Sequence, residues 1–162
     1  MSDTMVLYYS HTKLPNRGCT MIAAEMIQHA LESDMFRIEA DESNINTSWY
    51  INKKTVKKLS KIRPELIAYL DDLDGYKNVI LCSPCWWGTF PPTVFSQLDI
   101  LSFKKKRVSC LITHEGSCPD GCIKNMRQYC KGAEFVDFIL VHKDELSRMY
   151  MRIAKWAKDC VS

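Results

Sequence analysis

The chain has 162 residues, of which 46% are hydrophobic and 25% are charged, and its formal net charge is +3 at pH 7. This size and balance are typical of a compact globular domain with a substantial core, so we expect one domain over residues 1–162. No apolar stretch is as long as a membrane span, and the small basic excess argues against a nucleic-acid-binding protein.

The N-terminus and the cysteines indicate the compartment. Residues 2–4 are polar and lead directly into the apolar run MVLYY, which is too short for the core of a signal peptide. Eight cysteines in a chain with its own core and no export signal are expected to be free thiols rather than a disulfide framework. We therefore expect a cytoplasmic protein that binds neither membranes nor nucleic acids.

The hydrophobic pattern of the first half alternates strands with helices. An apolar run predicts a strand at 5–9, and residues 20–33 then place apolar side chains on one helical face. A second strand is predicted at 35–40. Residues 53–73 have a helical pattern that is interrupted near Pro64, where a new helix can begin.

The second half continues the alternation. Three further strands are predicted at 78–83, 107–113 and 134–141. Three further helices are predicted at 91–101, 122–130 and 143–158. Strands separated by helices of this length predict right-handed crossovers and a parallel sheet that is covered on both faces. The predicted fold class is therefore doubly wound α/β.

Loops that follow the strands carry the candidate binding residues, because doubly wound sheets bind ligands beyond the carboxyl ends of their strands. The loop at 10–20, SHTKLPNRGCT, offers hydroxyl groups and Gly18 ahead of a helix whose first N–H groups lack helical partners. This combination suits a phosphate group. An ordinary helix cap with a polar turn would have a similar composition.

The loop at 84–92 is the most unusual segment. It places Trp86 and Trp87 beside Gly88, which gives an aromatic surface with close backbone access. One buried tryptophan and one that covers a neighbouring loop is the alternative arrangement. A phosphate site and an aromatic surface at one edge of a sheet together suit an aromatic cofactor with a phosphate tail. A third loop, at 114–121, follows the fourth strand.

Several segments resemble flavodoxin-like proteins. YYSHT followed by GCT resembles the family pattern YFSxTGNT, and YKNVILCSPCWWGTFPPTV resembles YDxIxLGxPIWWGxxPxPV. ITHEGSC stands where the family has THGGSG, and MRQYCKGAEFV matches the helix and strand that follow. The resemblance covers nearly the whole chain, and its tryptophan segment is the most specific part. It implies a three-layer flavodoxin fold of five parallel strands in the order 2-1-3-4-5, with FMN bound non-covalently.

The resemblance also implies which residues bind FMN. The residues expected to hold the phosphate are Ser10, Thr12, Gly18, Cys19 and Thr20. The residues expected to line the isoalloxazine are Pro84, Cys85, Trp86, Trp87, Gly88 and Thr89. The residues expected to close its other side are Thr113, His114, Glu115, Gly116 and Ser117. His114 either bonds to the flavin and assists proton transfer or only packs in its loop, so no residue is assigned a catalytic role.

The chain departs from the family pattern at three places in this site. The residues KLPNR are inserted at 13–17, where Arg17 can bond to the phosphate but Pro15 can also hold the loop away from it. Cys19 replaces the usual Asn. Glu115 replaces a Gly, and it would lower the reduction potential of the flavin if it faced the ring rather than solvent.

Two alternatives to a simple flavin site follow from the sequence. Cys82 with Cys85, and Cys118 with Cys122, have spacings that zinc or an iron cluster can use, but such a metal would compete with FMN for space. We therefore predict no metal, with Cys118 and Cys122 as surface thiols or an oxidisable pair.

The sequence leaves two functions open. The first is an FMN-dependent redox protein that exchanges electrons with a partner protein or reduces a small molecule such as a quinone. The second is a flavodoxin-fold protein that has lost FMN and acts as a binding module.

Overall fold

The structure is a computed structural model, and it describes residues 2–12, 15–41, 61–116 and 119–162. Within these residues, five parallel strands form a sheet in the order β2-β1-β3-β4-β5. The strands are β1 (Thr4–Tyr9), β2 (Asp34–Ile38), β3 (Asn78–Pro84), β4 (Arg107–His114) and β5 (Glu134–His142). The predicted fold class and strand order are confirmed.

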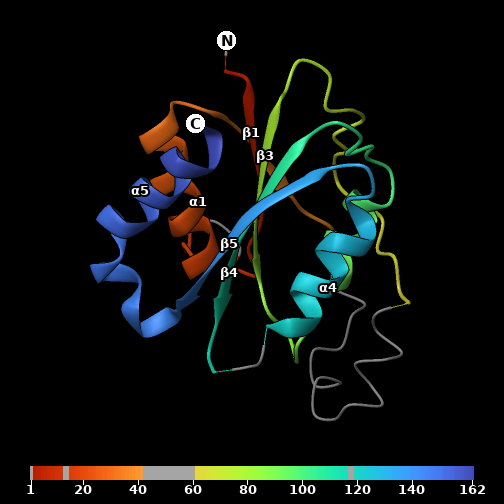
Figure 1. Cartoon of the computed structure of the whole chain (residues 1–162). Helices are drawn as coiled ribbons and strands as arrows, with labels where there is room; N and C mark the ends of the chain where they lie inside the picture. Colours follow the sequence, from red (N-terminus) through yellow and green to blue (C-terminus); the bar gives the residue numbers. More distant parts are fainter. Residues whose placement is uncertain (1, 13–14, 42–60, 117–118) are drawn as a thin grey trace.

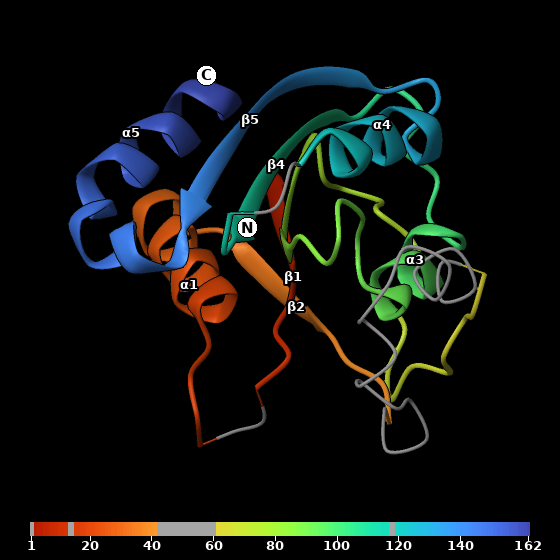
Figure 2. The ribbon, with the colours of Figure 1, turned by 90° about the horizontal axis from the view of Figure 1, so that it is seen from below.

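Helices cover both faces of the sheet. In the described part of the chain they are α1 (Cys19–Leu31), α3 (Pro92–Leu98), α4 (Asp120–Tyr129), the 3-10 helix η2 (Lys143–Arg148) and α5 (Tyr150–Val161). Figure 1 shows α1 and α5 on one side of the sheet and α4 on the other. Figure 2 places α3 beside α4. None of the described helices is long and apolar enough to cross a membrane.

The interior strand β1 shows why the sheet has a hydrophobic core on each face. Met5, Leu7 and Tyr9 pack into the core beneath α3 and α4, whereas Val6 and Tyr8 pack into the core beneath α1 and α5. Successive side chains of a strand point to opposite faces, so a strand that is buried on both faces needs a continuous apolar run. The run MVLYY meets this requirement, and all six residues of β1 are buried.

The prediction of a helix that continues through 61–73 is wrong. The N–H of Ile67 donates to the carbonyl of Glu39 over 2.8 Å. The N–H of Leu70 donates to Oε1 of Gln97 over 3.0 Å, and its carbonyl accepts from Nε2 over 2.8 Å. Tertiary partners therefore take the backbone groups that helical bonds would use, and they outweigh the helical periodicity of this segment. The preceding part of the predicted helix lies outside the described residues.

The helix predicted at 143–158 is divided. Residues 143–148 form η2, and α5 begins only after Met149. Leu146 and Ile153 are buried as the amphipathic pattern requires, but the side chain of Tyr150 is exposed. A 3-10 helix has three residues per turn instead of 3.6, so the face that it presents is out of phase with a continuous α-helix.

Candidate functional site

A cavity of about 680 Å³ opens at the carboxyl ends of β1, β3 and β4. Most of the predicted site residues line it. They are Ser10, Thr12, Gly18, Cys19, Thr20, Pro84, Cys85, Trp86, Trp87, Thr113, His114 and Glu115. The structure therefore brings together three loops that are far apart in the sequence, at the edge of the sheet where doubly wound folds bind ligands.

A few predicted site residues do not line the cavity. Gly88 and Thr89 turn toward α4, and Thr89 Oγ1 accepts a 2.7 Å hydrogen bond from Nδ2 of Asn125. Gly116 is also absent from the lining, and its N–H donates to Nδ1 of His114 over 3.0 Å. Ser117 lies outside the described residues.

One end of the cavity is rich in hydroxyl groups. Oγ of Ser10 and Oγ1 of Thr12 share a 3.1 Å hydrogen bond, and the hydroxyls of Thr20 and Thr113 share one of 2.7 Å. A Cβ atom on Gly18 would lie only 2.7 Å from both Oγ of Ser10 and Oγ1 of Thr12. The missing side chain therefore leaves room beside the hydroxyls at the start of α1.

The N-terminus of α1 faces this hydroxyl end. Its N-cap residue is Gly18, which has no side chain to accept from the N–H groups of the first turn. The first turn also has no acidic residue. Backbone donors, the positive end of the helix dipole and hydroxyl groups together favour an anion.

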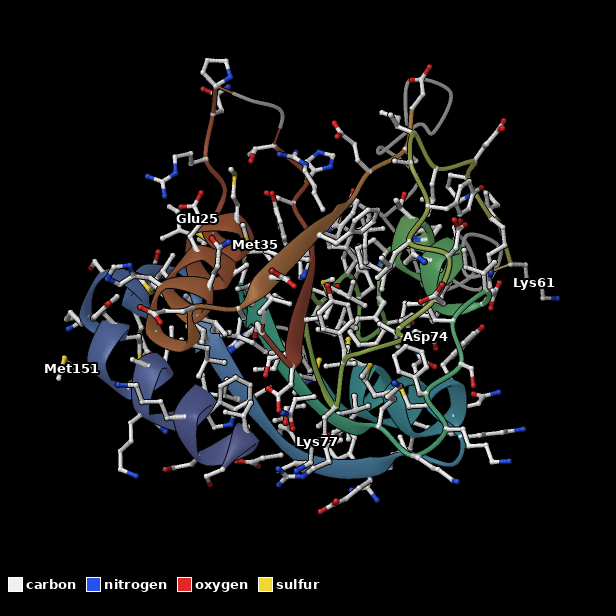
Figure 3. All side chains as sticks on the ribbon, turned by 90° about the horizontal axis from the view of Figure 1, so that it is seen from above. Glu25, Met35, Lys61, Asp74, Lys77 and Met151 are labelled. Atoms are coloured by element: carbon white, nitrogen blue, oxygen red, sulfur yellow. The ribbon has the colours of Figure 1, made fainter. Side chains whose placement is uncertain are left out.

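The basic residues near the hydroxyl groups have other partners than the sequence predicted. Arg17 does not line the cavity but forms an ion pair with Glu25, which Figure 3 shows on α1. Instead, Nη2 of Arg37 donates to the carbonyl of Thr12 over 2.7 Å. The guanidinium of Arg37 also lies 5.9 Å from the ring centre of Tyr8. Arg37 thus holds the first loop from β2, a role that the sequence did not predict.

Another part of the cavity lining belongs to a tight turn. The N–H of Trp86 donates to the carbonyl of Thr89 over 2.8 Å, and the N–H of Thr89 donates back over 3.2 Å. Between them, Trp87 has φ of 54° and Gly88 has φ of 84°. Positive φ at both central residues defines a type I′ turn, which is strained at any residue with a bulky side chain. Trp87 occupies the strained position.

The two tryptophans have different surroundings. Trp86 packs edge-on against Tyr9, with ring centres 5.6 Å apart, and against His11, at 5.4 Å. Trp87 leaves 55% of its surface exposed and lines the cavity. Residues with strained backbone conformations cluster at functional sites. Trp87 is therefore the more exposed aromatic surface for a ligand, and Trp86, which also lines the cavity, is held by its packing against Tyr9 and His11.

Helix α4 packs directly against this turn. A Cβ atom on Gly121 would overlap the carbonyl oxygen of Gly88 and would lie 3.0 Å from its carbonyl carbon. The turn and the helix can therefore approach so closely only because residue 121 has no side chain. The hydrogen bond from Asn125 to Thr89 joins the same two elements one helical turn later.

Lys143, which the sequence analysis did not select, lines the wall near β4. Its Nζ lies 3.1 Å from Oε1 of Glu115, and both side chains are largely exposed. The hydrogen bond and the charge of Glu115 raise the pKa of Lys143. The carboxylate of Glu115 thus faces a cation at the cavity rather than standing alone beside it.

The predicted absence of a metal remains a prediction. Among the described residues, no group of three or more His, Cys, Asp and Glu side chains is placed to hold a metal ion. Cys118 lies outside the described residues. Cys82 is fully buried in β3, and burial raises the pKa of its thiol.

A model of the flavodoxin family matches residues 4–159. The chain belongs to the flavodoxin family. This confirms the resemblance seen in the sequence. FMN, the cofactor that the resemblance implies, agrees with this membership and with a similar structure that contains FMN. A comparison with curated proteins found no match.

Solved structures share the flavodoxin fold at low sequence identity. A candidate flavoprotein from Bacteroides uniformis ATCC 8492 is 20% identical, with a TM-score of 0.76 over 97% of this chain and 98% of that chain. A flavoprotein from Lactobacillus acidophilus NCFM in complex with FMN is 17% identical, with a TM-score of 0.64 over 93% and 99%. The NAD(P)H:quinone oxidoreductase from Methanothermobacter marburgensis is 10% identical, with a TM-score of 0.59 over 100% and 98%.

Proposed function

We propose that this flavodoxin-family protein binds FMN non-covalently in the cavity and uses it as a redox cofactor. The observation that carries the proposal is the chemistry of the cavity lining. Hydroxyl groups, a helix N-terminus and the exposed ring of Trp87 line the same cavity. FMN needs both kinds of surface, since a phosphate tail extends from a flat aromatic ring. The similar structure in complex with FMN supports the proposal.

The residues present fit the two ends of this cofactor. The phosphate would be held by the hydroxyls of Ser10, Thr12 and Thr20 and by N–H groups of α1, in the space that Gly18 leaves open. The ring would lie near Trp87, with His114 on the opposite wall. FMN supplies the electron-transfer chemistry when it is bound, and the protein sets its position and its potential.

The charge of the chain favours a reductase over a carrier. Flavodoxins that carry electrons between proteins are typically acidic, whereas this chain has a net charge of +3. Quinone-dependent oxidation of NADH or NADPH by the FMN-loaded protein tests this choice. Turnover supports a reductase, and loaded protein that does not turn over supports a carrier.

An FMN titration of the protein tests the proposed function directly. Stoichiometric quenching of flavin fluorescence, with a shifted visible spectrum, is the expected result. Riboflavin, which lacks the phosphate, should bind more weakly because it cannot use the N-terminus of α1. No quenching by FMN would reject the proposal and would leave the protein as a flavodoxin-fold binding module without FMN.

Gly18→Ala is expected to weaken FMN binding by about tenfold, or about 1.4 kcal/mol. The new methyl group would meet the hydroxyls of Ser10 and Thr12 and fill the space proposed for the phosphate. Both hydroxyls are side-chain ends that can rotate away, so the stability of the apoprotein should change little. The matched control is riboflavin, whose affinity should not change. An equal loss for FMN and riboflavin would place the phosphate elsewhere.

Lys143→Gln and Glu115→Gln are expected to shift the midpoint potential of bound FMN in opposite directions. Without Lys143, the carboxylate of Glu115 is unbalanced, so the negatively charged reduced flavin is destabilised and the potential falls. Without Glu115, the potential rises. Redox titrations followed by absorbance measure both shifts, which should shrink in high salt. Lys155→Gln is the control, because Lys155 pairs with Asp159 on α5 and does not line the cavity.

A further inference from the structure

Two cysteines from different elements meet behind the wall of the cavity. Cys85 follows β3, lines the cavity and is 7% exposed. Cys122 lies in the first turn of α4 and is fully buried. Both belong to the same buried cluster, and their thiols are in hydrogen-bond contact. Neither residue has a role in the proposed flavin chemistry that requires a thiol pair.

The surrounding backbone holds this pair together. On one side, the N–H of Cys85 donates to the carbonyl of Thr113 over 2.9 Å, which fixes the start of the loop to β4. On the other side, Gly88 packs directly on Gly121, the residue that precedes Cys122. Both chain segments are therefore anchored next to their cysteines, which keeps the two free thiols together.

We propose that Cys85 and Cys122 form a dithiol that peroxide oxidises to a disulfide. Cys85 is the attacking thiol because it reaches the cavity, through which a small oxidant can enter. Cys122 is the resolving thiol because it is fully buried and contacts the sulfur of Cys85. This assignment differs from the sequence-based pairing of Cys122 with Cys118.

The reaction balances with hydrogen peroxide as the oxidant. The Cys85 thiolate attacks one peroxide oxygen, so that an S–O bond forms, the O–O bond breaks and the departing hydroxide becomes water with the thiol proton. Cys85 is then a sulfenic acid. The sulfur of Cys122 attacks the sulfur of Cys85, the S–S bond forms, and the S–O bond breaks to release a second water with the proton of Cys122. Two thiols thus give two electrons to one peroxide.

The environment of Cys85 differs from that of the other buried cysteines. The hydrogen bond from Cys122 lowers the pKa of the Cys85 thiol, burial opposes this, and the N–H of Gly88 adds to the lowering. Burial instead raises the pKa of Cys110 and Cys160, and it raises that of Cys130 to about 12. Since the thiolate is the nucleophile, this difference favours oxidation at Cys85.

The test treats the full-length, flavin-free chain with hydrogen peroxide, alkylates the remaining thiols and maps the peptides by mass spectrometry. We expect the first product to be a peptide pair joined by a Cys85–Cys122 disulfide, which dithiothreitol reverses. Cys85 should be lost at least about tenfold faster than Cys130. Because the experiment uses no FMN, its outcome is independent of the proposed function.

Variants distinguish the attacking role of Cys85 from the resolving role of Cys122. In Cys122→Ala, peroxide should leave Cys85 as a sulfenic acid that dimedone traps, and no disulfide should form. Cys130→Ala, which removes another buried thiol of the same region, should form the Cys85–Cys122 disulfide at the wild-type rate. The proposal is overturned if wild-type Cys85 is oxidised no faster than Cys130, or if Cys122 is joined to Cys118 or any other cysteine instead. Both of these outcomes come from the wild-type chain and need no variant to fold.

Discussion

Gly121→Ala is expected to weaken FMN binding by roughly a hundredfold, or about 2.7 kcal/mol. The added Cβ would overlap the carbonyl oxygen of Gly88. The Cβ atom and the carbonyl oxygen are both attached directly to the backbone and cannot rotate away, so α4 or the turn must move. The turn carries Trp87 and the cavity wall, and its displacement removes the surface proposed for the isoalloxazine.

The same substitution is expected to destabilise the protein, although Gly→Ala within a helix usually stabilises it by about 1 kcal/mol. Overpacking of this kind costs about 1–3 kcal/mol, so the net change should reverse the usual sign. FMN titration and urea unfolding measure the two effects. Gln128→Ala, at an exposed position of α4, is the control and should change neither. Unchanged FMN affinity in Gly121→Ala would show that the site does not depend on the contact between α4 and the turn.

The sequence predicted the sheet because its central strands are buried on both faces. Val79, Ile80, Leu81 and Cys82 form a continuous apolar run in β3, and each residue is at most 1% exposed. Such a run has no polar face that another arrangement could expose to solvent. It can therefore be recognised in the sequence as a buried strand, and the order of these strands along the chain can be read directly. Residues 61–73 have no comparable constraint. Their conformation depends on partners such as Gln97 that periodicity cannot identify.

The sequence predicted most cavity residues that lie within recognisable loops, although it missed His11 in the first loop, and it missed Lys143, which the fold brings in from outside. Lys143 follows β5, whose carboxyl end lies beside that of β4, with His142 opposite His114 in the register. Its position could have been inferred from the predicted parallel order, because neighbouring parallel strands end at the same edge of the sheet. Arg37 does not line the cavity but contacts the first loop from within β2. Contact with Glu115 or Thr12, however, depends on side-chain conformation.

Sequence alone could not distinguish the roles of Trp86 and Trp87. A type I′ turn has mirror-image dihedral angles that favour Asn-Gly or Gly-Gly, and nothing in the pair Trp-Gly indicates it. The structure separates the two rings through this turn. Trp86 packs against Tyr9 and His11, whereas Trp87 takes the strained position, lines the cavity and is more than half exposed.

That strain gives a prediction in which affinity changes more than stability. Trp87→Gly should lower the stability of the apoprotein by only about 1 kcal/mol, because glycine adopts φ of 54° without the side-chain penalty of about 1–2 kcal/mol. This relief offsets most of the roughly 2.5 kcal/mol that the buried part of the half-exposed ring contributes. The same substitution should weaken FMN binding by roughly 30-fold, or about 2 kcal/mol, through the loss of aromatic stacking.

Glu32→Gly is the matched control for this prediction. Glu32 has φ of 51° at the C-cap of α1, outside the cavity, so its replacement relieves the same kind of strain without touching the site. Urea unfolding should show Glu32→Gly to be more stable than the wild type and Trp87→Gly slightly less stable, and FMN titration should show a loss of affinity in Trp87→Gly alone. If Trp87→Gly binds FMN as tightly as Glu32→Gly does, the strained tryptophan is not the surface on which the flavin rests. If Glu32→Gly also loses stability, the positive φ values carry no strain that glycine can relieve, and the conformation of Trp87 needs no functional explanation.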